Sequence, residues 1–210
     1  MSDLKKAIDT IVDRRNTYLV AEEYYEGTNL EVFSNNRWLH VLGTIRNNFR
    51  FNFARTVVDS VLHRLEIANI TANTEEANSK IKDIWEMNDL QIDADEIHRR
   101  ALVYGDCYAI VWTDVNGNTT VDYNSPLTTV MVYDDENPRT KRFAAKLWQS
   151  EDPLDYTKKT SHLNMYYPDR IEKYTMPGEV INIVSANGFL PVSVVENPWG
   201  EVPVFHFRTS

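Results

Sequence analysis

The side chains that could perform chemistry are few and scattered along the 210-residue chain. No two histidines have the spacing that places two metal ligands on one face of a helix, and none lies in an HExxH motif. This pattern is typical of structural or surface histidines rather than of a metal centre. The five are His40, His63, His98, His162 and His206.

Two pairs of adjacent carboxylates, Asp134-Asp135 and Glu22-Glu23, are the remaining candidates for metal binding or acid–base chemistry. The first pair comes just before an Asn-Pro dipeptide, which favours a solvated turn. One hypothesis is nevertheless a metal-dependent hydrolase that uses Asp134, Asp135 and a histidine. It predicts that these side chains meet in one cleft.

The single cysteine, Cys107, lies in an apolar run without a nucleophile motif, so we expect it to be a small core residue. One cysteine excludes an intrachain disulfide and any metal site of paired cysteines. The seven glycines stand singly, so no phosphate-binding loop is present. The sequence predicts no catalytic residue, no cofactor and no metal, and it assigns no DNA-contacting residue.

The composition is that of a folded, acidic protein. Hydrophobic residues make up 42% of the chain, and the formal net charge is -9. A protein that clamps duplex DNA needs clustered Lys and Arg, whereas an acidic surface suits a protein past which DNA slides. The N-terminus lacks the apolar segment of a signal peptide, and no run reaches the ~18 apolar residues of a membrane span. These features favour a cytoplasm-like compartment and no membrane partner.

The elements that must position these residues begin with an amphipathic helix of about six turns over residues 46–67. Phe49, Phe53, Val57, Val61 and Leu65 recur every fourth residue and form its apolar stripe. Because two phenylalanines make this stripe bulky, we expect the rest of the chain to pack against it. A stripe open to water would contradict this expectation.

The other faces of this helix are locally basic, with four arginines against Asp59 and Glu66. They fit either contact with nucleic acid or an acidic neighbouring subunit, or a solvated face with ion pairs inside the helix, and the second interpretation is favoured. The many aromatic residues of the chain lie mostly in core-like patterns rather than in base-stacking ones. The arginines are Arg46, Arg50, Arg55 and Arg64.

Three further helices are predicted around this one. Residues 3–25 form the first, with Ser2 as its N-cap and Gly27 as its stop. Another follows Asn73 or Thr74, either of which could cap it, and a last one runs from about Asp93 to Tyr104 and stops at Gly105.

From residue 107 the apolar period changes from helical to two, which indicates strands. Three hairpins are expected, over 107–123, 127–148 and 164–176, with a polar loop at 150–160 between the second and third. Residues 180–184 and 192–195 are further strand candidates. The order predicts an α+β fold in which a mainly helical part, 1–106, packs on an antiparallel β part, 107–210.

The segment NFARTVVDSVLHRLEI, residues 52–67, resembles a helix of the portal proteins of tailed bacteriophages. In that helix the apolar pair Val57-Val58 is followed by Asp59-Ser60 and then by Arg64-Leu65. Other segments resemble the same family in the same order, which makes the combination more specific than any one motif. They are Tyr24–Gly27, the helix-to-strand junction Arg99–Tyr108, the later hairpin Leu163–Tyr174 and the end segment Asn197–Val204.

This resemblance implies a structural subunit without catalytic residues. Such proteins form a closed ring, usually a dodecamer, at one vertex of the capsid. The ring is the channel for DNA entry and exit, passes DNA without sequence-specific binding, and contacts capsid and scaffolding proteins. It also docks the terminase motor and, later, the head–tail adaptor. The implied location is the portal vertex of the virion, after assembly in the host cytoplasm.

The resemblance covers the outer, wing half of a portal subunit. The chain ends at Ser210, where the family's stem helix would begin, so we expect the stem, clip and crown to be absent from it. No channel-lining or terminase-binding residue can therefore be transferred. A free-standing α+β interaction module with the same pattern is the alternative.

Overall fold

The computed structural model describes residues 2–28, 52–153, 155–178 and 188–209. Within these ranges helices come first and strands follow, in the order that the sequence predicts. The helices are α1 (Asp3–Glu26), α3 (Phe53–Leu62), α4 (Glu75–Met87) and α5 (Leu90–Tyr104). The strands are β1 (Asp106–Thr113), β2 (Thr119–Asn124), β3 (Thr129–Tyr133), β4 (Lys141–Asp152), β5 (Asp155–Tyr166), β6 (Arg170–Pro177), β7 (Leu190–Glu196) and β8 (Val204–Arg208).

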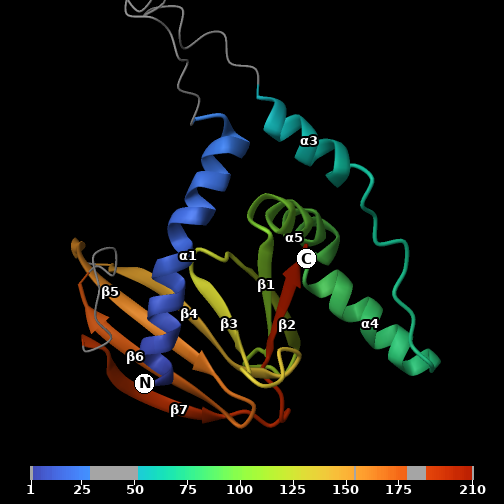
Figure 1. Cartoon of the computed structure of the whole chain (residues 1–210). Coiled ribbons are helices and arrows are strands. Elements are labelled where there is room, and N and C mark those ends of the chain that lie inside the picture. The colour runs from blue at the N-terminus through green and yellow to red at the C-terminus, as the bar shows by residue number, and fades with distance from the viewer. Residues whose placement is uncertain (1, 29–51, 154, 179–187, 210) are drawn as a thin grey trace, which may run out of the picture.

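The strands form two antiparallel sheets stacked between helices (Figure 1). The larger sheet has the strand order β3-β4-β5-β6-β7, and the smaller has the order β2-β1-β8. Helix α1 lies on one face of the larger sheet, and the smaller sheet lies on the other face and is itself covered by α5 (Figure 1). The α+β architecture of N-terminal helices on antiparallel hairpins is thus confirmed.

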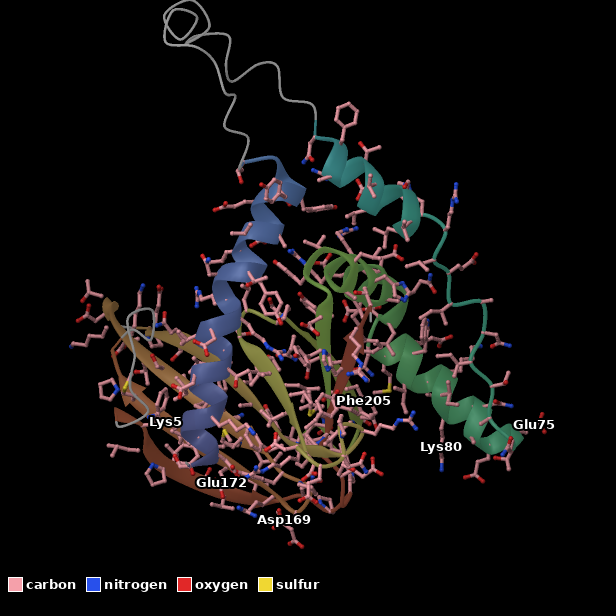
Figure 2. The ribbon with its side chains drawn as sticks, in the orientation of Figure 1. Lys5, Glu75, Lys80, Asp169, Glu172 and Phe205 are labelled. Atoms are coloured by element: carbon pink, nitrogen blue, oxygen red, sulfur yellow. The ribbon has the colours of Figure 1, made fainter. Side chains whose placement is uncertain are left out.

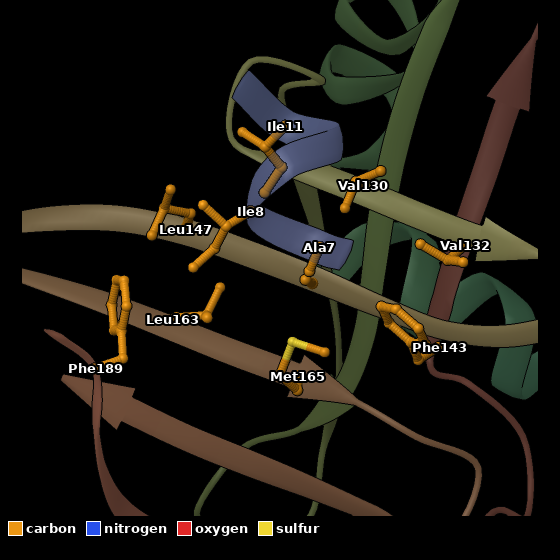
Figure 3. Packing of buried hydrophobic residues seen from close by; sticks show 11 residues of the cluster. Ala7, Ile8, Ile11, Val130, Val132, Phe143, Leu147, Leu163, Met165 and Phe189 are labelled. Carbon is orange, nitrogen blue, oxygen red and sulfur yellow. The ribbon is translucent and has the colours of Figure 1, made fainter. Parts of the chain in front are cut away.

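Helix α1 is the element on which the main core is built. The Ser2 hydroxyl accepts a hydrogen bond from the Lys5 amide, and Gly27 ends the helix at φ 74°, as the sequence predicts. The apolar stripe of the first turns packs onto strands β3, β4 and β5 (Figure 3). Its members are Ala7, Ile8 and Ile11, and they contact Val130, Phe143, Leu147, Leu163 and Met165 among others.

A second core fills the space between the two sheets. Tyr108 and Ile110 of β1 point toward the larger sheet, where they meet Met131, Ala144 and Tyr166. The alternate residues of β1 point the other way, toward α5. Cys107 is one of these and is fully buried, so the prediction that it is a core residue is confirmed.

The helix predicted over residues 46–67 is the largest correction. Within the described residues it runs only from Phe53 to Leu62, and residues 46–51, including Arg46, Phe49 and Arg50, lie outside them. The chain does not pack around its stripe, since Phe53, Val57, Val61 and Leu65 are 73%, 64%, 43% and 41% exposed. The spacing correctly indicates an apolar face, but spacing does not say what covers that face, and within one chain α1 supplies the helical surface of the core.

Three smaller differences concern single elements. Residues 150–160, predicted to be a loop, belong to the long β4–β5 hairpin, because polar and charged strands exposed to water lack the apolar alternation used to predict strands. Helix α5 begins at Leu90 rather than near Asp93, and β8 pairs with β1 where the sequence pattern indicated no strand. The strand candidate 180–184 lies outside the described residues. The three predicted hairpins are confirmed as the pairs β1–β2, β3–β4 and β5–β6. The predicted strand around 192–195 is confirmed as part of β7.

Candidate functional site

A polar cluster around Asp106 joins α1 to both sheets. The Tyr18 hydroxyl of α1 donates a hydrogen bond to Asp106 Oδ2 at 2.6 Å, and His206 Nε2 of β8 donates to Asp106 Oδ1 at 2.7 Å. The other ring nitrogen of His206, Nδ1, accepts from the Tyr133 hydroxyl of β3 at 2.9 Å. The ring of His206 also stacks on Tyr108, with 4.6 Å between the centroids. The carboxylate therefore links β1 directly to α1 and β8, and His206 extends the link to β3.

The electrostatics of this cluster favour the charged carboxylate. Partial burial alone would raise the pKa of Asp106, but the hydrogen bonds from His206 and Tyr18 outweigh burial and lower it below its ordinary value. Burial and the bond to this carboxylate raise the pKa of Tyr18 to about 12. Arg14 adds a positive charge 4.0 Å from Asp106.

The cluster contains the residue types of an acid–base relay, but its histidine is not accessible to a substrate. The side chain of His206 is only 6% exposed, and both of its ring nitrogens are already engaged. A general base must present a free nitrogen to a substrate proton, and His206 presents none. The cluster is a structural link that fastens the C-terminal strand to the first helix.

A second set of contacts fixes α3 against the upper ends of α1 and α5. The Tyr25 hydroxyl of α1 donates to Asp59 of α3 at 3.0 Å, and Arg55 lies over the Tyr25 ring at 5.4 Å from its centroid. Arg55 also pairs with Asp59 along the helix at 3.5 Å, which confirms the predicted ion pair within the helix. Leu62 is the buried residue of α3. These contacts use one side of α3 and direct its apolar side outward.

Helix α5 is tied to α1 in the same region. Arg100 bonds Glu96 one turn earlier at 2.6 Å and reaches Glu22 of α1 at 3.3 Å. Tyr18 and Tyr104 pack edge to face nearby, with ring centroids 5.7 Å apart. Glu22, a candidate metal ligand in sequence, is therefore an ion-pair partner in the structure.

Among the residues that the structure describes, two groups of exposed apolar side chains lie on helix α3 and on strand β7. The first, which we call the α3 face, consists of Val57, Val61 and Leu65, with Phe53 in the same row. The second, the β7 surface, is on an edge strand in which every residue is exposed, and it consists of Val192 and Val194, which are 60% and 65% exposed. Leu190 is 64% exposed, but a register shift in the pairing of β6 with β7 places it on the other face of the sheet from Val194. The two surfaces lie at opposite ends of the molecule, with α3 at the upper right and β7 at the lower left in Figure 1. Apolar surfaces of this kind mark sites of protein–protein contact.

The residues proposed for hydrolysis do not come together. Asp134 Oδ1 accepts the backbone amides of Glu136 and Asn137, both at 2.9 Å, so it shapes its own turn. Asp135 is exposed and pairs with Lys6 at 3.5 Å. These contacts confirm the solvated turn, and they contradict the hydrolase hypothesis, in which both carboxylates share a cleft with a histidine.

The described histidines lie on four separate segments, and His40 lies outside the described residues. His63 caps the C-terminal end of α3, His98 is on α5, and His162 of β5 stacks on Trp148 at 5.2 Å. Among the residues that the structure describes, no group of three or more His, Cys, Asp or Glu side chains is placed to hold a metal ion.

A groove opens between α4 and the extended segment that precedes it. Its volume is about 510 Å³, and its lining mixes apolar residues such as Ile70, Ile81 and Trp85 with polar ones such as Lys82 and Glu86. Figure 2 shows this helix, with Glu75 and Lys80, projecting from the body at the end of the molecule away from Lys5 and Glu172.

Sequence reasoning missed both the Asp106 cluster and the β7 surface. A signal for the first was available, because Asp106 lies between the helix stop at Gly105 and the apolar strand, and His206 lies between Phe205 and Phe207. A polar residue in a buried strand must find a partner, but the sequence does not say which one. The β7 surface gave no signal, since alternating valines read equally well as core.

These features define a class of protein that acts by shape and contact: a layered α+β subunit with structural polar links and two exposed apolar surfaces. A family model described as phage portal protein, SPP1 Gp6-like, matches residues 4–209. The chain belongs to this phage portal protein family. Membership implies a structural role, assembly into an oligomeric ring and association with the capsid.

Two further findings accompany this match. No curated protein matches the chain. In the described part of the chain, no helix is both long enough and apolar enough to span a membrane.

Proposed function

We propose that this chain is the wing region of a subunit of a dodecameric portal ring at one capsid vertex. The observation that carries the proposal is the family match over residues 4–209. Two exposed apolar surfaces on one protomer support it, because a subunit of a closed ring needs a contact surface on each side. Within this proposal, residues 1–106 are the mainly helical part of the wing and 107–210 the antiparallel β part.

In this role the ring is the channel through which DNA enters during packaging and leaves during ejection. It offers docking sites to capsid and scaffolding proteins, the terminase and the head–tail adaptor. A net charge of -9 supports passage without tight binding, because few basic groups are available to replace the counterions of DNA phosphates. Assembly takes place in the host cytoplasm, and the finished ring resides in the virion.

The protein performs no bond-making in this proposal. In the polar cluster that most resembles a catalytic relay, the side chain of His206 is only 6% exposed, and Asp106 already accepts hydrogen bonds from Tyr18 and His206. The work of the subunit is geometric, since the ring holds an opening of fixed size at the vertex.

Electron micrographs of the purified protein test the proposal. We expect annular particles with a central opening and one dominant rotational symmetry. Micrographs that show only globular particles of protomer size, at a protein concentration well above that used for known ring assemblies, would refute the proposal. A preparation treated with high salt serves as a comparison, since an apolar contact should survive salt.

A further inference from the structure

The two exposed apolar surfaces described above are suited to each other. We propose that the α3 face of one copy packs against the β7 end of the larger sheet in a second copy of this chain, as the contact between neighbours in the ring. This inference rests on the proposed function and adds to it the identity of the contacting surfaces. Val57 and Val61 represent one side of the contact, and Val194 represents the other.

The first argument concerns symmetry. A surface that pairs with its own copy gives a two-fold dimer, in which no surface of that kind is left for a third subunit. A ring requires a head-to-tail contact between two different surfaces of one protomer. The α3 face and β7 lie at opposite ends of the protomer (Figure 1), which is the placement that a head-to-tail contact needs.

The second argument concerns the existing layers. Val194 lies opposite Glu172 in the sheet, and Glu172 lies opposite Met165, which is part of the core beneath α1. Residues opposite each other in neighbouring strands point to the same side, so Val194 is on the face of the sheet that α1 covers. The core beneath α1 involves β3, β4 and β5, and Val194 is left exposed beyond it.

A helix from a neighbour would therefore extend a layer that this fold already has. The α3 face has apolar residues four positions apart, and α1 meets the sheet through a comparable stripe in which Leu4, Ile8 and Ile11 are four and three positions apart. Because the rest of α3 is fixed to α1 and α5 through Asp59 and Leu62, the face is held rigidly outward. A preformed face binds at a lower entropic cost.

The third argument is the charge beside each surface. Arg64 is exposed immediately after α3, next to Leu65. Glu196 is exposed at the end of β7, and Asp169 is exposed at the neighbouring β5–β6 turn, which Figure 2 shows at the same end of the molecule as Glu172. Asp169 already pairs with Arg170 at 2.9 Å, so Glu196 is the acidic group that can meet Arg64 of a neighbour. Opposite charges beside the two surfaces favour this pairing over either surface with itself.

Mixing two surface variants tests the proposal. Val57→Asp disables the α3 face and Val194→Asp disables the β7 surface, and since both side chains are exposed, both variants should fold. We expect each variant alone to lose rings, with self-association weakened about tenfold or more. Mixed together, they should form one-to-one pairs, because one intact α3 face can still meet one intact β7 surface.

The control is Val115→Asp, which changes a fully exposed valine in the β1–β2 turn, outside both surfaces. It should assemble as the wild type does. Circular dichroism and the Tm of each variant confirm folding. A misfolded variant is replaced by Val61→Ser or Val192→Ser on the same surfaces, and the same outcomes apply.

Three outcomes are decisive. Loss of rings in both variants and pairing on mixing support the proposal. Rings that persist in either folded variant, or dimers formed by one variant alone, overturn the α3–β7 contact but leave the proposed function standing. A wild-type protein that forms no rings overturns the proposed function itself.

Discussion

Asp106 links the C-terminal strand to the first helix. Its carboxylate accepts hydrogen bonds from Tyr18 of α1 and His206 of β8, in addition to the backbone pairing of β8 with β1 and the burial of Val204 between the sheets. The contact therefore connects the first and last described elements of the chain. A residue of this kind contributes through the groups that it satisfies, since leaving a buried donor unpaired is costly.

We expect Asp106→Asn to destabilise the protein by about 1–3 kcal/mol, because the amide cannot accept both hydrogen bonds as a charged carboxylate does. Urea unfolding followed by tyrosine and tryptophan fluorescence measures the change. Asp83→Asn, on the exposed side of α4, is the matched control and should change stability by less than about 0.5 kcal/mol. Equal stability of the two variants would show that the cluster is dispensable.

The carboxylate of Asp106 also makes the free energy of unfolding decrease as the pH falls. The pKa of Asp106 is lower in the folded state than in the unfolded chain, so its contribution to stability is present above the unfolded value of about 4. It is lost as the pH falls through the lower folded value. The free energy of unfolding of the wild type should thus fall more steeply below pH 4 than that of Asp106→Asn, and parallel curves would contradict this assignment.

Tyrosines with raised pKa values make the protein lose stability at high pH, as Asp106 does at low pH. Burial raises the pKa of Tyr18, Tyr104 and Tyr174 to about 12, each with help from a neighbouring carboxylate. Because the unfolded chain ionises near pH 10, this stability is complete below pH 10 and is lost as the pH rises toward 12. Absorbance at 295 nm should show a group of tyrosines that titrate above pH 11 only while the protein is folded. A titration identical with that in guanidinium would refute this.

Cys107 should be unreactive for the same physical reason. It is fully buried, and burial raises the pKa of its thiol to about 12, so almost no thiolate is present at neutral pH. We expect labelling by a disulfide reagent at pH 8 to be at least about a hundredfold slower in the native protein than in urea. Rapid labelling without denaturant would mean that the β1–α5 packing opens readily.

Helix α1 carries the largest packing contribution of any single helix in the described chain. Ile8→Ala removes a buried side chain from the core on the larger sheet and should cost about 2–5 kcal/mol. Val12→Ala, one turn later on the same helix but exposed, is the control and should cost well under 1 kcal/mol. Thermal unfolding of both variants separates the two cases, and a similar Tm would show that α1 is not the element around which the core forms.

Local signals explain which elements could be predicted from the sequence. The sequence on either side of helix α1 supplies both of its caps, Ser2 and Gly27. The hairpins are marked by turn residues such as Asn116-Gly117. Such features act over a few residues, so the sequence alone specifies them. By contrast, β8 forms because β1 is available as its partner, and pairing between distant segments leaves no local mark.

The exposed α3 stripe shows the same limit for packing. Its spacing predicts an amphipathic helix, and an amphipathic helix is there, but the expectation that this chain buries the stripe is wrong. Apolar periodicity reports that a face needs a partner and not whether the partner is the same chain or another. The solvated turn at Asp134 could be predicted from the Asn-Pro dipeptide that follows it, whereas the Asp106 cluster needed the fold to bring Tyr18, Tyr133 and His206 together.

At the level of the whole molecule, the protomer is a layered body with its polar links inside and its apolar surfaces at two ends (Figure 1). That arrangement suits a subunit that is completed by copies of itself. A net charge of -9 on each copy limits non-specific association by repulsion. Specific association then depends on the apolar surfaces. The family match implies an oligomeric ring, and apolar surfaces at two ends are what a subunit of a ring needs.

Native mass spectrometry of the purified protein tests this ring most directly. The protomer mass is 24.4 kDa, so a closed ring appears as one dominant assembly whose mass is a fixed whole multiple of that value. We expect such a species at the dodecamer mass, and we expect Val57→Asp to replace it with species at or near the protomer mass of 24.4 kDa. A protein that remains a monomer, or that spreads over a ladder of open oligomers with no favoured size, would contradict the account.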